Sequence, residues 1–264
     1  MLAALFTLLP AFTGLAAAAP VPGDHDTSSA DDWTPYPDPN PTPAHPDYAW
    51  PDHDHKGEAW APSYKTGCDV STLHLPKYAY DNHTADWDHG ELMVPEDQRL
   101  KIVTIGRGVQ TYTCKSGVYV STGAMADLYD TSCILSRADD YQSFAANLPY
   151  YAYDAVPYPW PEHENPYRYI KHEFVEYQGE NVPKWTRTDG YYMYGKKVGS
   201  YSPDEKNIPW LRLEYLPIEA GNEDHLLAKT VLRTDTVGGV PPPSCHEEGK
   251  AISVPYAANY YFYA

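Results

Sequence analysis

The sequence predicts an all-β protein: an antiparallel β-sandwich or barrel that has long loops and is cross-linked by disulfides. The chain contains 25 Tyr and 26 Pro but only 5 Phe, a composition that favours extended strands and turns over long helices. Many short β-leaning runs follow one another without helical repeats between them. The last run alternates on one face, as a strand with a buried side does, through Val254, Tyr256, Ala258, Tyr260 and Phe262.

The amino end is typical of a secretory signal peptide. An apolar run, Leu2–Leu9, precedes the small residues Ala16-Ala17-Ala18, so we expect residues 1–18 to be removed after Ala18. Residues 19–67 form an acidic, Pro-rich arm with nine acidic residues and two lysines between Asp24 and Lys65. Proline lacks the N–H that helices and interior strands need. The arm is therefore predicted to be disordered, and residues 68–264 to form a single all-β domain.

The arm contains an alternation of His and Asp at Asp52-His53-Asp54-His55. Imidazole and carboxylate groups could hold a divalent metal there, through His53 and His55. A solvated flexible tail is the simpler interpretation of the same residues, so we predict no metal site and no cofactor.

Within the domain, short runs punctuated by glycine and proline predict the strands. One plausible helix spans Ser132–Leu148, and the Tyr- and Pro-dense tract Leu148–Pro166 is predicted to be a surface loop. The runs expected to form strands are Lys101–Ile105, Val109–Cys114, Gly123–Tyr129, Tyr167–Tyr177, Tyr191–Tyr194, Trp210–Leu216, Ala228–Thr236 and Val254–Tyr263.

Secretion affects how the cysteines are interpreted. Outside the cell, Cys68, Cys114, Cys133 and Cys245 are expected to form two disulfides, and their spacing leaves all three pairings open. The sequence Asn82-His83-Thr84 is the only N-glycosylation sequon, so Asn82 is a candidate glycosylation site.

The net charge of the chain argues against two classes of binding partner. The formal net charge is −17 at pH 7, which disfavours nucleic acids and anionic membrane surfaces. No later stretch approaches the roughly 18 consecutive apolar residues of a membrane span. We therefore expect no nucleic-acid partner and no membrane span, while the oligomeric state is open.

One motif suggests a dinucleotide site. Gly106-Arg107-Gly108 follows the β-leaning run Lys101–Ile105, but the following run, Val109–Thr113, is a poor helix and a good strand. A pyrophosphate would have no helix amino terminus to bind. A glycine turn between two strands is the simpler interpretation.

Other catalytic candidates rest on isolated residues. His172, at the centre of a predicted strand, could act as a general base with Glu173 or Asp189 nearby, although a structural histidine is the more ordinary assignment. Acidic pairs such as Glu162/Glu164 could in principle serve as the acid and nucleophile of a glycosidase. In a chain with 36 acidic residues, their proximity in sequence is weak evidence for this role. The 7 Trp and 25 Tyr could instead form a surface that binds a glycan or a small apolar ligand.

Several stretches together resemble one family. They are Leu100–Cys114, Gly123–Cys133, Trp185 with Asp189-Gly190, Ile208–Leu213, Arg233–Cys245 and Val254–Tyr263. The sequence is similar to a family of secreted proteins of unknown function, found mainly in filamentous fungi and in bacteria, many of whose fungal members carry the name malate dehydrogenase. The resemblance spans roughly Cys68–Tyr263 and excludes the arm.

The resemblance carries two implications. Bacterial members keep only the cysteines that match Cys114 and Cys245, which implies that these two pair and leaves Cys68 for Cys133. The name implies malate oxidation, which needs a nicotinamide site, a His–Asp pair and arginines that clamp a dicarboxylate. No spacing links the arginines considered for such a clamp, which are Arg107, Arg137, Arg168, Arg187 and Arg212.

The sequence thus predicts a secreted, extracellular or cell-wall-associated β-domain of unknown biochemical role. Binding of a glycan or a small apolar ligand is the first hypothesis for that role. An extracellular enzyme with a site near His172 and Asp189 is the alternative. A malate dehydrogenase is the weakest hypothesis.

Overall fold

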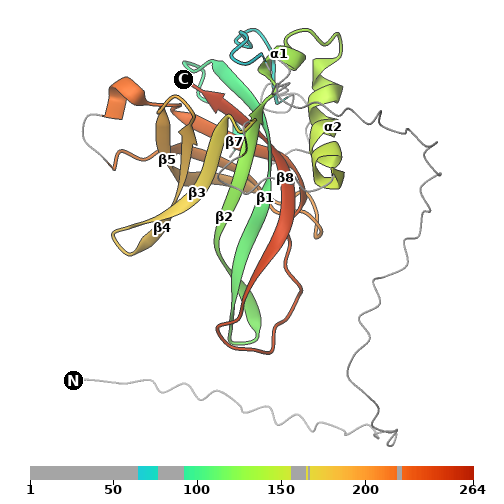
Figure 1. Cartoon of the computed structure of the whole chain (residues 1–264), viewed down its shortest axis with the longest axis vertical. Coiled ribbons are helices and arrows are strands. Elements are labelled where there is room, and N and C mark those ends of the chain that lie inside the picture. The colour runs from blue at the N-terminus through green and yellow to red at the C-terminus, as the bar shows by residue number, and fades with distance from the viewer. Residues whose placement is uncertain (1–64, 77–91, 156–164, 166, 219–221) are drawn as a thin grey trace, which may run out of the picture. The chain divides into compact units, whose positions relative to one another are not determined.

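The computed structural model describes residues 65–76, 92–155, 165, 167–218 and 222–264, and all of them belong to one unit of the chain, Ala59–Ala264. Eight antiparallel strands form a closed barrel in which each strand pairs with the next and β8 pairs with β1 (Figure 1). The prediction of an all-β sandwich or barrel is confirmed, with the barrel as the outcome. The strands are β1 Leu100–Lys115, β2 Val118–Asp130, β3 Ile170–Tyr177, β4 Glu180–Arg187, β5 Tyr192–Tyr201, β6 Trp210–Tyr215, β7 Thr230–Gly238 and β8 Ala251–Tyr263.

Strand β1 continues through the glycines that the sequence suggested as a turn, so that interpretation is wrong. A Cβ atom on Gly106 would lie 2.5 Å from Cε2 of Tyr260, and one on Gly108 would lie 1.9 Å from the carbonyl oxygen of Met125 on the neighbouring strand. The glycines therefore allow close packing inside the strand, which is the usual role of a strand-interior glycine.

The alternation predicted for the last strand is confirmed. Tyr256, Ala258, Tyr260 and Phe262 of β8 belong to the cluster of apolar side chains that fills the barrel. The other face of β8 is buried too, because Tyr261 and Tyr263 belong to a second cluster on the outside of the barrel. Burial on both faces explains why this strand is apolar almost throughout.

Strand β4 was not among the predicted runs. It contains Pro183, which normally disfavours an interior strand. β4 pairs with β5 only over Lys184–Thr186, so Pro183 lies where the strand is bonded to β3 alone. A proline is tolerated at such a position.

The predicted helix forms with different bounds. It is divided into α1, Ser132–Leu135, and α2, Tyr141–Asp154, and α2 begins after Asp140, whose side chain accepts a hydrogen bond from the Ser143 N–H at 3.1 Å. The expectation of a loop from Leu148 is wrong as far as Asp154. Sequence reasoning stopped the helix too early because proline disfavours helix interiors, and Pro149 lies inside α2.

A side chain of the barrel replaces the hydrogen-bond donor that α2 lacks at Pro149. A proline has no N–H for the carbonyl four residues earlier, here that of Ala145. The Asn259 side chain of β8 donates a hydrogen bond to this carbonyl at 2.7 Å. Helix and barrel are thus joined by a buried polar contact that local sequence does not reveal.

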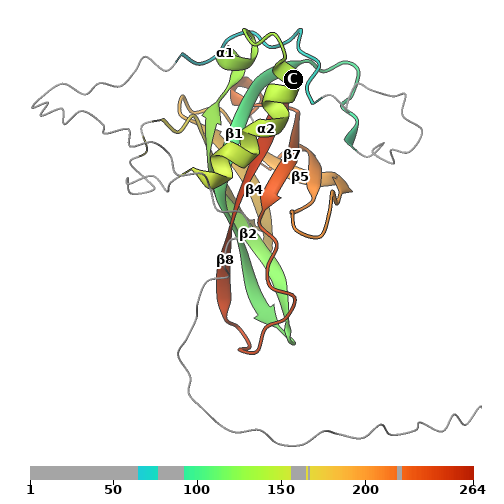
Figure 2. The same ribbon diagram turned by 90° about the vertical axis from the view of Figure 1, so that its right-hand side faces the viewer.

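Helix α2 packs against β8, β7 and β1 (Figure 2). The second apolar cluster lies in this layer and also includes residues that precede the barrel. We call it the outer cluster, and its buried members are Val70, Leu75, Leu100, Val103, Leu135, Ala145, Leu232, Tyr261 and Tyr263.

Two disulfides join Cys68 to Cys133 and Cys114 to Cys245, the pairing that the family resemblance implies. The first ties the segment before the barrel to α1, and the second ties β1 to the segment before β8. Within the described part of the chain, no helix is long and apolar enough to cross a membrane.

Several sequence predictions fall outside the described residues. These are the signal peptide 1–18, the arm up to residue 64, the histidines His53 and His55, the sequon at Asn82 and the pair Glu162/Glu164.

Candidate functional site

The inside of the barrel is filled at one level and hollow at another. Trp185, Met193 and Leu227 are at most 5% exposed. They belong to the cluster of buried apolar side chains that fills the barrel, which we call the inner cluster. A cavity of about 770 Å³ opens beside this packed level, within the size range of small-molecule sites, roughly 300–1,000 Å³.

Most of the cavity wall is apolar. Phe174 of β3, Leu211 and Leu213 of β6 and Ile208 before β6 contribute to it. These residues also pack against or belong to the inner cluster. The cavity therefore replaces part of the barrel's own core, and an apolar molecule that entered it would be removed from water.

Arg233 of β7 is a buried charged residue in the lining of this cavity. It is only 7% exposed, and its Nη2 donates to the carbonyl oxygen of Pro209 at 2.8 Å. Its Nε–H is buried without an acceptor, and the guanidinium carbon lies 5.9 Å from the ring centroid of Tyr256. Among the described residues, no carboxylate lies within 4.0 Å of this side chain. A buried cation without an anion is rare in a folded protein.

A bulge in β7 separates Arg233 from the nearest acidic residue along the strand. Strict alternation would place Asp235 on the same face as Arg233. The pairing of β7 with β8 shifts register between Thr234 and Val237, and Asp235 has a φ of 50°, in the left-handed region. Its carboxylate consequently lies on the outside of the barrel, under α2.

The Asp235 carboxylate is satisfied by neighbouring donors. Its Oδ2 accepts hydrogen bonds from Thr234 Oγ1 at 2.9 Å and Asn259 Nδ2 at 3.0 Å, with the Tyr261 hydroxyl at 3.5 Å. Burial nevertheless raises the pKa of Asp235, while these hydrogen bonds lower it. Asp235 lines a second, smaller cavity of about 210 Å³ between α2 and the barrel.

The mouth of the large cavity adds further positive charge. Lys196 and Lys197 of β5 line it and are exposed. With Arg233, the described lining contains three basic side chains and one acidic side chain, Glu180. This local balance is opposite in sign to the net charge of −17 of the whole chain.

Two tyrosines next to Arg233 stay uncharged. The hydroxyls of Tyr256 and Tyr260 lie 2.7 Å apart, and burial raises the pKa of both, against the lowering effect of Arg233. Neither can supply an anion for Arg233 at neutral pH.

His172 lies inside the barrel, at the packed level. Its ring stacks on Trp185, with centroids 4.5 Å apart, and its Nδ1 donates to the carbonyl oxygen of Lys184 at 3.1 Å. The pKa of His172 is lowered to about 3, mainly by burial and to a smaller extent by the charge of Arg233, against the raising effect of the bond to Lys184. A histidine that is neutral at pH 7 and difficult to protonate is a weak general base.

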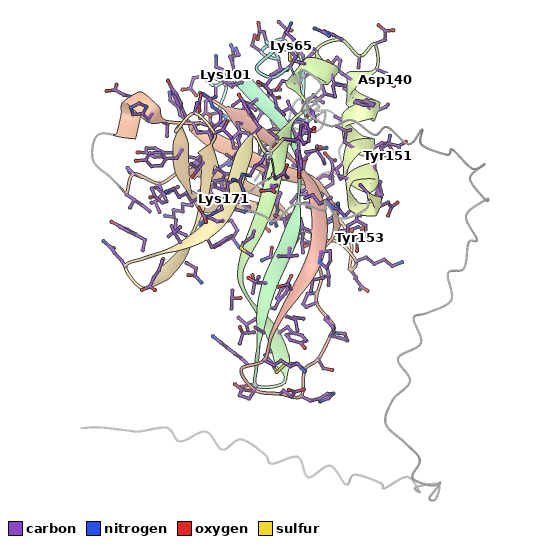
Figure 3. The ribbon with its side chains drawn as sticks, in the orientation of Figure 1. Lys65, Lys101, Asp140, Tyr151, Tyr153 and Lys171 are labelled. Carbon is purple, nitrogen blue, oxygen red and sulfur yellow. A yellow bond between two sulfur atoms is a disulfide. The ribbon has the colours of Figure 1, made fainter. Side chains whose placement is uncertain are left out.

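The structure does not bring the three catalytic candidates together. Glu173 faces away from the barrel and pairs with Lys171 at 2.6 Å (Lys171 is labelled on β3 in Figure 3). Asp189, in the turn after β4, binds Arg187 through both oxygens at 2.7 Å, which holds the pKa of Asp189 below its ordinary value. Neither they nor His172 line the large cavity, so the enzyme hypothesis gains no support from this arrangement.

The features needed for metal binding or malate oxidation are not assembled either. In the described ranges, no three His, Cys, Asp or Glu residues are grouped to hold a metal ion. Two of the arginines that a dicarboxylate clamp would need bind other groups: Arg168 pairs with Asp127, and Arg212 with Glu214 and the Met93 carbonyl. Gly106-Arg107-Gly108 lies within a strand and precedes no helix.

Sequence reasoning missed Arg233 itself. The residue was visible inside the predicted strand Ala228–Thr236, at the position that alternation places on the same face as Val231. An arginine on the apolar face of a strand is the signal that could have identified it.

The fold and the cavity define a class: a closed antiparallel β-barrel with a cavity whose lining includes a buried arginine, for which the described residues provide no carboxylate partner. The chain belongs to a family described as "Protein of unknown function (DUF3455)", whose model matches residues 95–264. This match confirms the resemblance to a family of unknown function. No curated protein and no solved structure shows significant similarity to the chain.

Proposed function

We propose that this protein binds a small, largely apolar ligand inside its barrel and acts outside the cell. The observation that supports the proposal most strongly is the cavity of about 770 Å³ in the barrel interior, with Phe174, Leu211 and Leu213 in its wall. Concave, mostly apolar cavities with a few polar groups are the usual form of small-molecule sites. Antiparallel barrels commonly hold such a ligand in their interior.

An extracellular location is supported by the cysteines. All four are paired in disulfides, and disulfides persist mainly in oxidising compartments. The proposed signal peptide predicts that the secreted protein begins at Ala19. Amino-terminal sequencing of protein recovered from the culture medium of a cell that expresses the full chain tests this, and an intact Met1 on intracellular protein would contradict it.

Binding is testable with a neutral fluorescent apolar probe, N-phenyl-1-naphthylamine. We expect saturable fluorescence enhancement with about one probe per chain. The variant Leu211→Trp places a larger side chain in the cavity wall and should weaken binding at least about tenfold, because filling the cavity removes the space for the probe.

The matched control is Ile134→Trp, which introduces the same side chain on α1, where Ile134 is 49% exposed. It should bind the probe like the unmodified chain. Failure of the unmodified chain to bind, or equal binding by Leu211→Trp at unchanged melting temperature, would overturn the proposal.

A glycan ligand is the second candidate, and it is favoured by aromatic side chains on the outer face of α2. Tyr150 and Tyr151 are 56% and 69% exposed, and Tyr151 projects away from the barrel (Figure 3). The tryptophans of the described residues do not form such a surface, because Trp185 is buried and Trp210 is half-buried. Glycan-array binding that is lost in Tyr150→Ala/Tyr151→Ala would support this candidate, and a flat array would remove it.

A further inference from the structure

The buried charge in the cavity lining points to a narrower class of ligand. We propose that Arg233 is an anion-recognition residue and that the ligand of the barrel is an amphiphile with an apolar body and a carboxylate head group. This inference rests on the proposed binding function, since it specifies the ligand of the same cavity.

Arg233 is a charged residue that is buried. An arginine side chain remains protonated inside proteins, and this one is 7% exposed. Removing such a cation from water is costly unless an anion compensates it. The described residues supply the Pro209 carbonyl and the neutral hydroxyls of Tyr256 and Tyr260, and no carboxylate within 4.0 Å. The compensating anion is therefore absent from the described part of the chain.

The nearest acidic residue on strand β7 faces the other way. Asp235 is two residues along β7, yet the bulge turns it to the outside, where Thr234 and Asn259 bind it. A salt bridge within the strand would have neutralised Arg233 at little structural cost. The bulge instead keeps the inner charge available.

A carboxylate is the anion that fits Arg233 and its surroundings. A guanidinium group offers a planar fork of N–H donors that matches a carboxylate, and here the Nε–H has no acceptor. The apolar wall, with Phe174, Leu211 and Leu213, suits a hydrocarbon body. Lys196 and Lys197 at the mouth favour the approach of an anion over that of a cation.

The test is a set of calorimetric titrations of the full chain with three ten-carbon probes of different head group: decanoate, decanol and decylamine. We expect decanoate to bind at least about tenfold more tightly than decanol, and decylamine to bind most weakly. In Arg233→Met, which retains an apolar side chain of similar length, decanoate and decanol should bind equally.

The matched control is Lys171→Gln, which removes one positive charge from β3 on the outside of the barrel. Its preference for decanoate should be unchanged. Arg233→Lys retains the charge without the fork and should keep part of the preference, which separates charge from geometry.

The outcomes are distinguishable. Equal binding of decanoate and decanol by the unmodified chain would overturn the role of Arg233 and leave the binding function intact, and this result needs no variant to fold. A decanoate preference that persists in folded Arg233→Met would also overturn it. Failure of all three probes to bind would overturn the binding function and this inference together.

Discussion

The inner and outer faces of strand β7 carry opposite charges that are handled in opposite ways. Inside the barrel, Arg233 borders a cavity of about 770 Å³ and has a single carbonyl acceptor. Outside, Asp235 borders a cavity of about 210 Å³ and accepts hydrogen bonds from neighbouring donors. The outer charge is part of the structure that attaches α2 to the barrel. The inner charge has no carboxylate partner among the described residues, and this difference is the reason that we propose the inner cavity as the binding site.

The largest change in stability is expected at Asn259, which bonds both to α2 and to Asp235. Asn259→Ala removes the donor to the Ala145 carbonyl and to Asp235, and leaves two buried acceptors short of a donor. We expect a loss of about 3 kcal/mol in the free energy of unfolding, since each buried unsatisfied group costs roughly 1–3 kcal/mol. Urea denaturation measures it.

The control for this prediction is Asn147→Ala. Asn147 also bonds to a backbone carbonyl of α2, that of Ser143 at 2.8 Å, but it is exposed. Its loss should cost less than about 0.5 kcal/mol. Similar costs for the two variants would show that the outer polar contacts are not structural.

The second effect is the pH dependence of stability that is caused by His172, inside the barrel. The pKa of His172 is lowered by burial to about 3, from an ordinary value of 6.5. Between these values the unfolded chain binds the proton more readily, so His172 favours folding above pH 6.5, and this stability is lost as the pH falls. We expect its contribution to fall by roughly 1.5–2 kcal/mol between pH 6.5 and 5.

Denaturation curves at several pH values measure this slope. The variant His172→Gln has no titrating ring, so its free energy of unfolding should lack the His172 contribution to the pH dependence. An unchanged pH dependence in this variant, or an NMR titration of His172 near pH 6.5, would contradict the buried, neutral state.

The third effect tests the inner arginine as a functional rather than a stabilising group. Arg233→Met removes a buried cation for which the described residues provide no anionic partner, so the free energy of unfolding should change by no more than about 1 kcal/mol, or should rise. Thermal denaturation without ligand measures it. A loss of about 3 kcal/mol or more would show that Arg233 is part of the structural framework instead.

The smallest effect concerns the outer carboxylate. Because burial raises the pKa of Asp235 above its ordinary 3.8, the stability that this group contributes is present at low pH and is lost as the pH rises. Asp235→Asn, whose side chain tolerates the left-handed backbone, should be more stable than the unmodified chain at pH 7 by up to about 1 kcal/mol. The difference should shrink toward pH 4. A constant difference across this range would exclude titration of Asp235 as its cause.

The fold was accessible from the sequence where one residue pattern determined one element. Alternation in Val254–Tyr263 predicted β8, and β-branched and aromatic runs predicted the other strands except β4. Local patterns failed where a distant partner decides the outcome. Pro149 remains inside a helix because Asn259, far along the chain, replaces the missing donor. Gly106 remains inside a strand because the ring of Tyr260 needs the space.

The candidate site was less accessible from the sequence. His172 was selected for its chemistry, but burial against Trp185 makes it a packed core residue. Arg233 and Asp235 look like an ordinary pair of charges in the strand, and simple alternation would place them together. The bulge between Thr234 and Val237 depends on pairing with β8, and no pattern within β7 alone predicts it.

The most direct test of the account is a crystal structure of the full chain grown with 10-bromodecanoate, located by the anomalous signal of bromine. The account predicts that bromine lies inside the barrel near Phe174 and Leu211, with the carboxylate on the guanidinium of Arg233. Bromine in the outer cavity beside Asp235, or a barrel interior without the probe at saturating concentration, would contradict it.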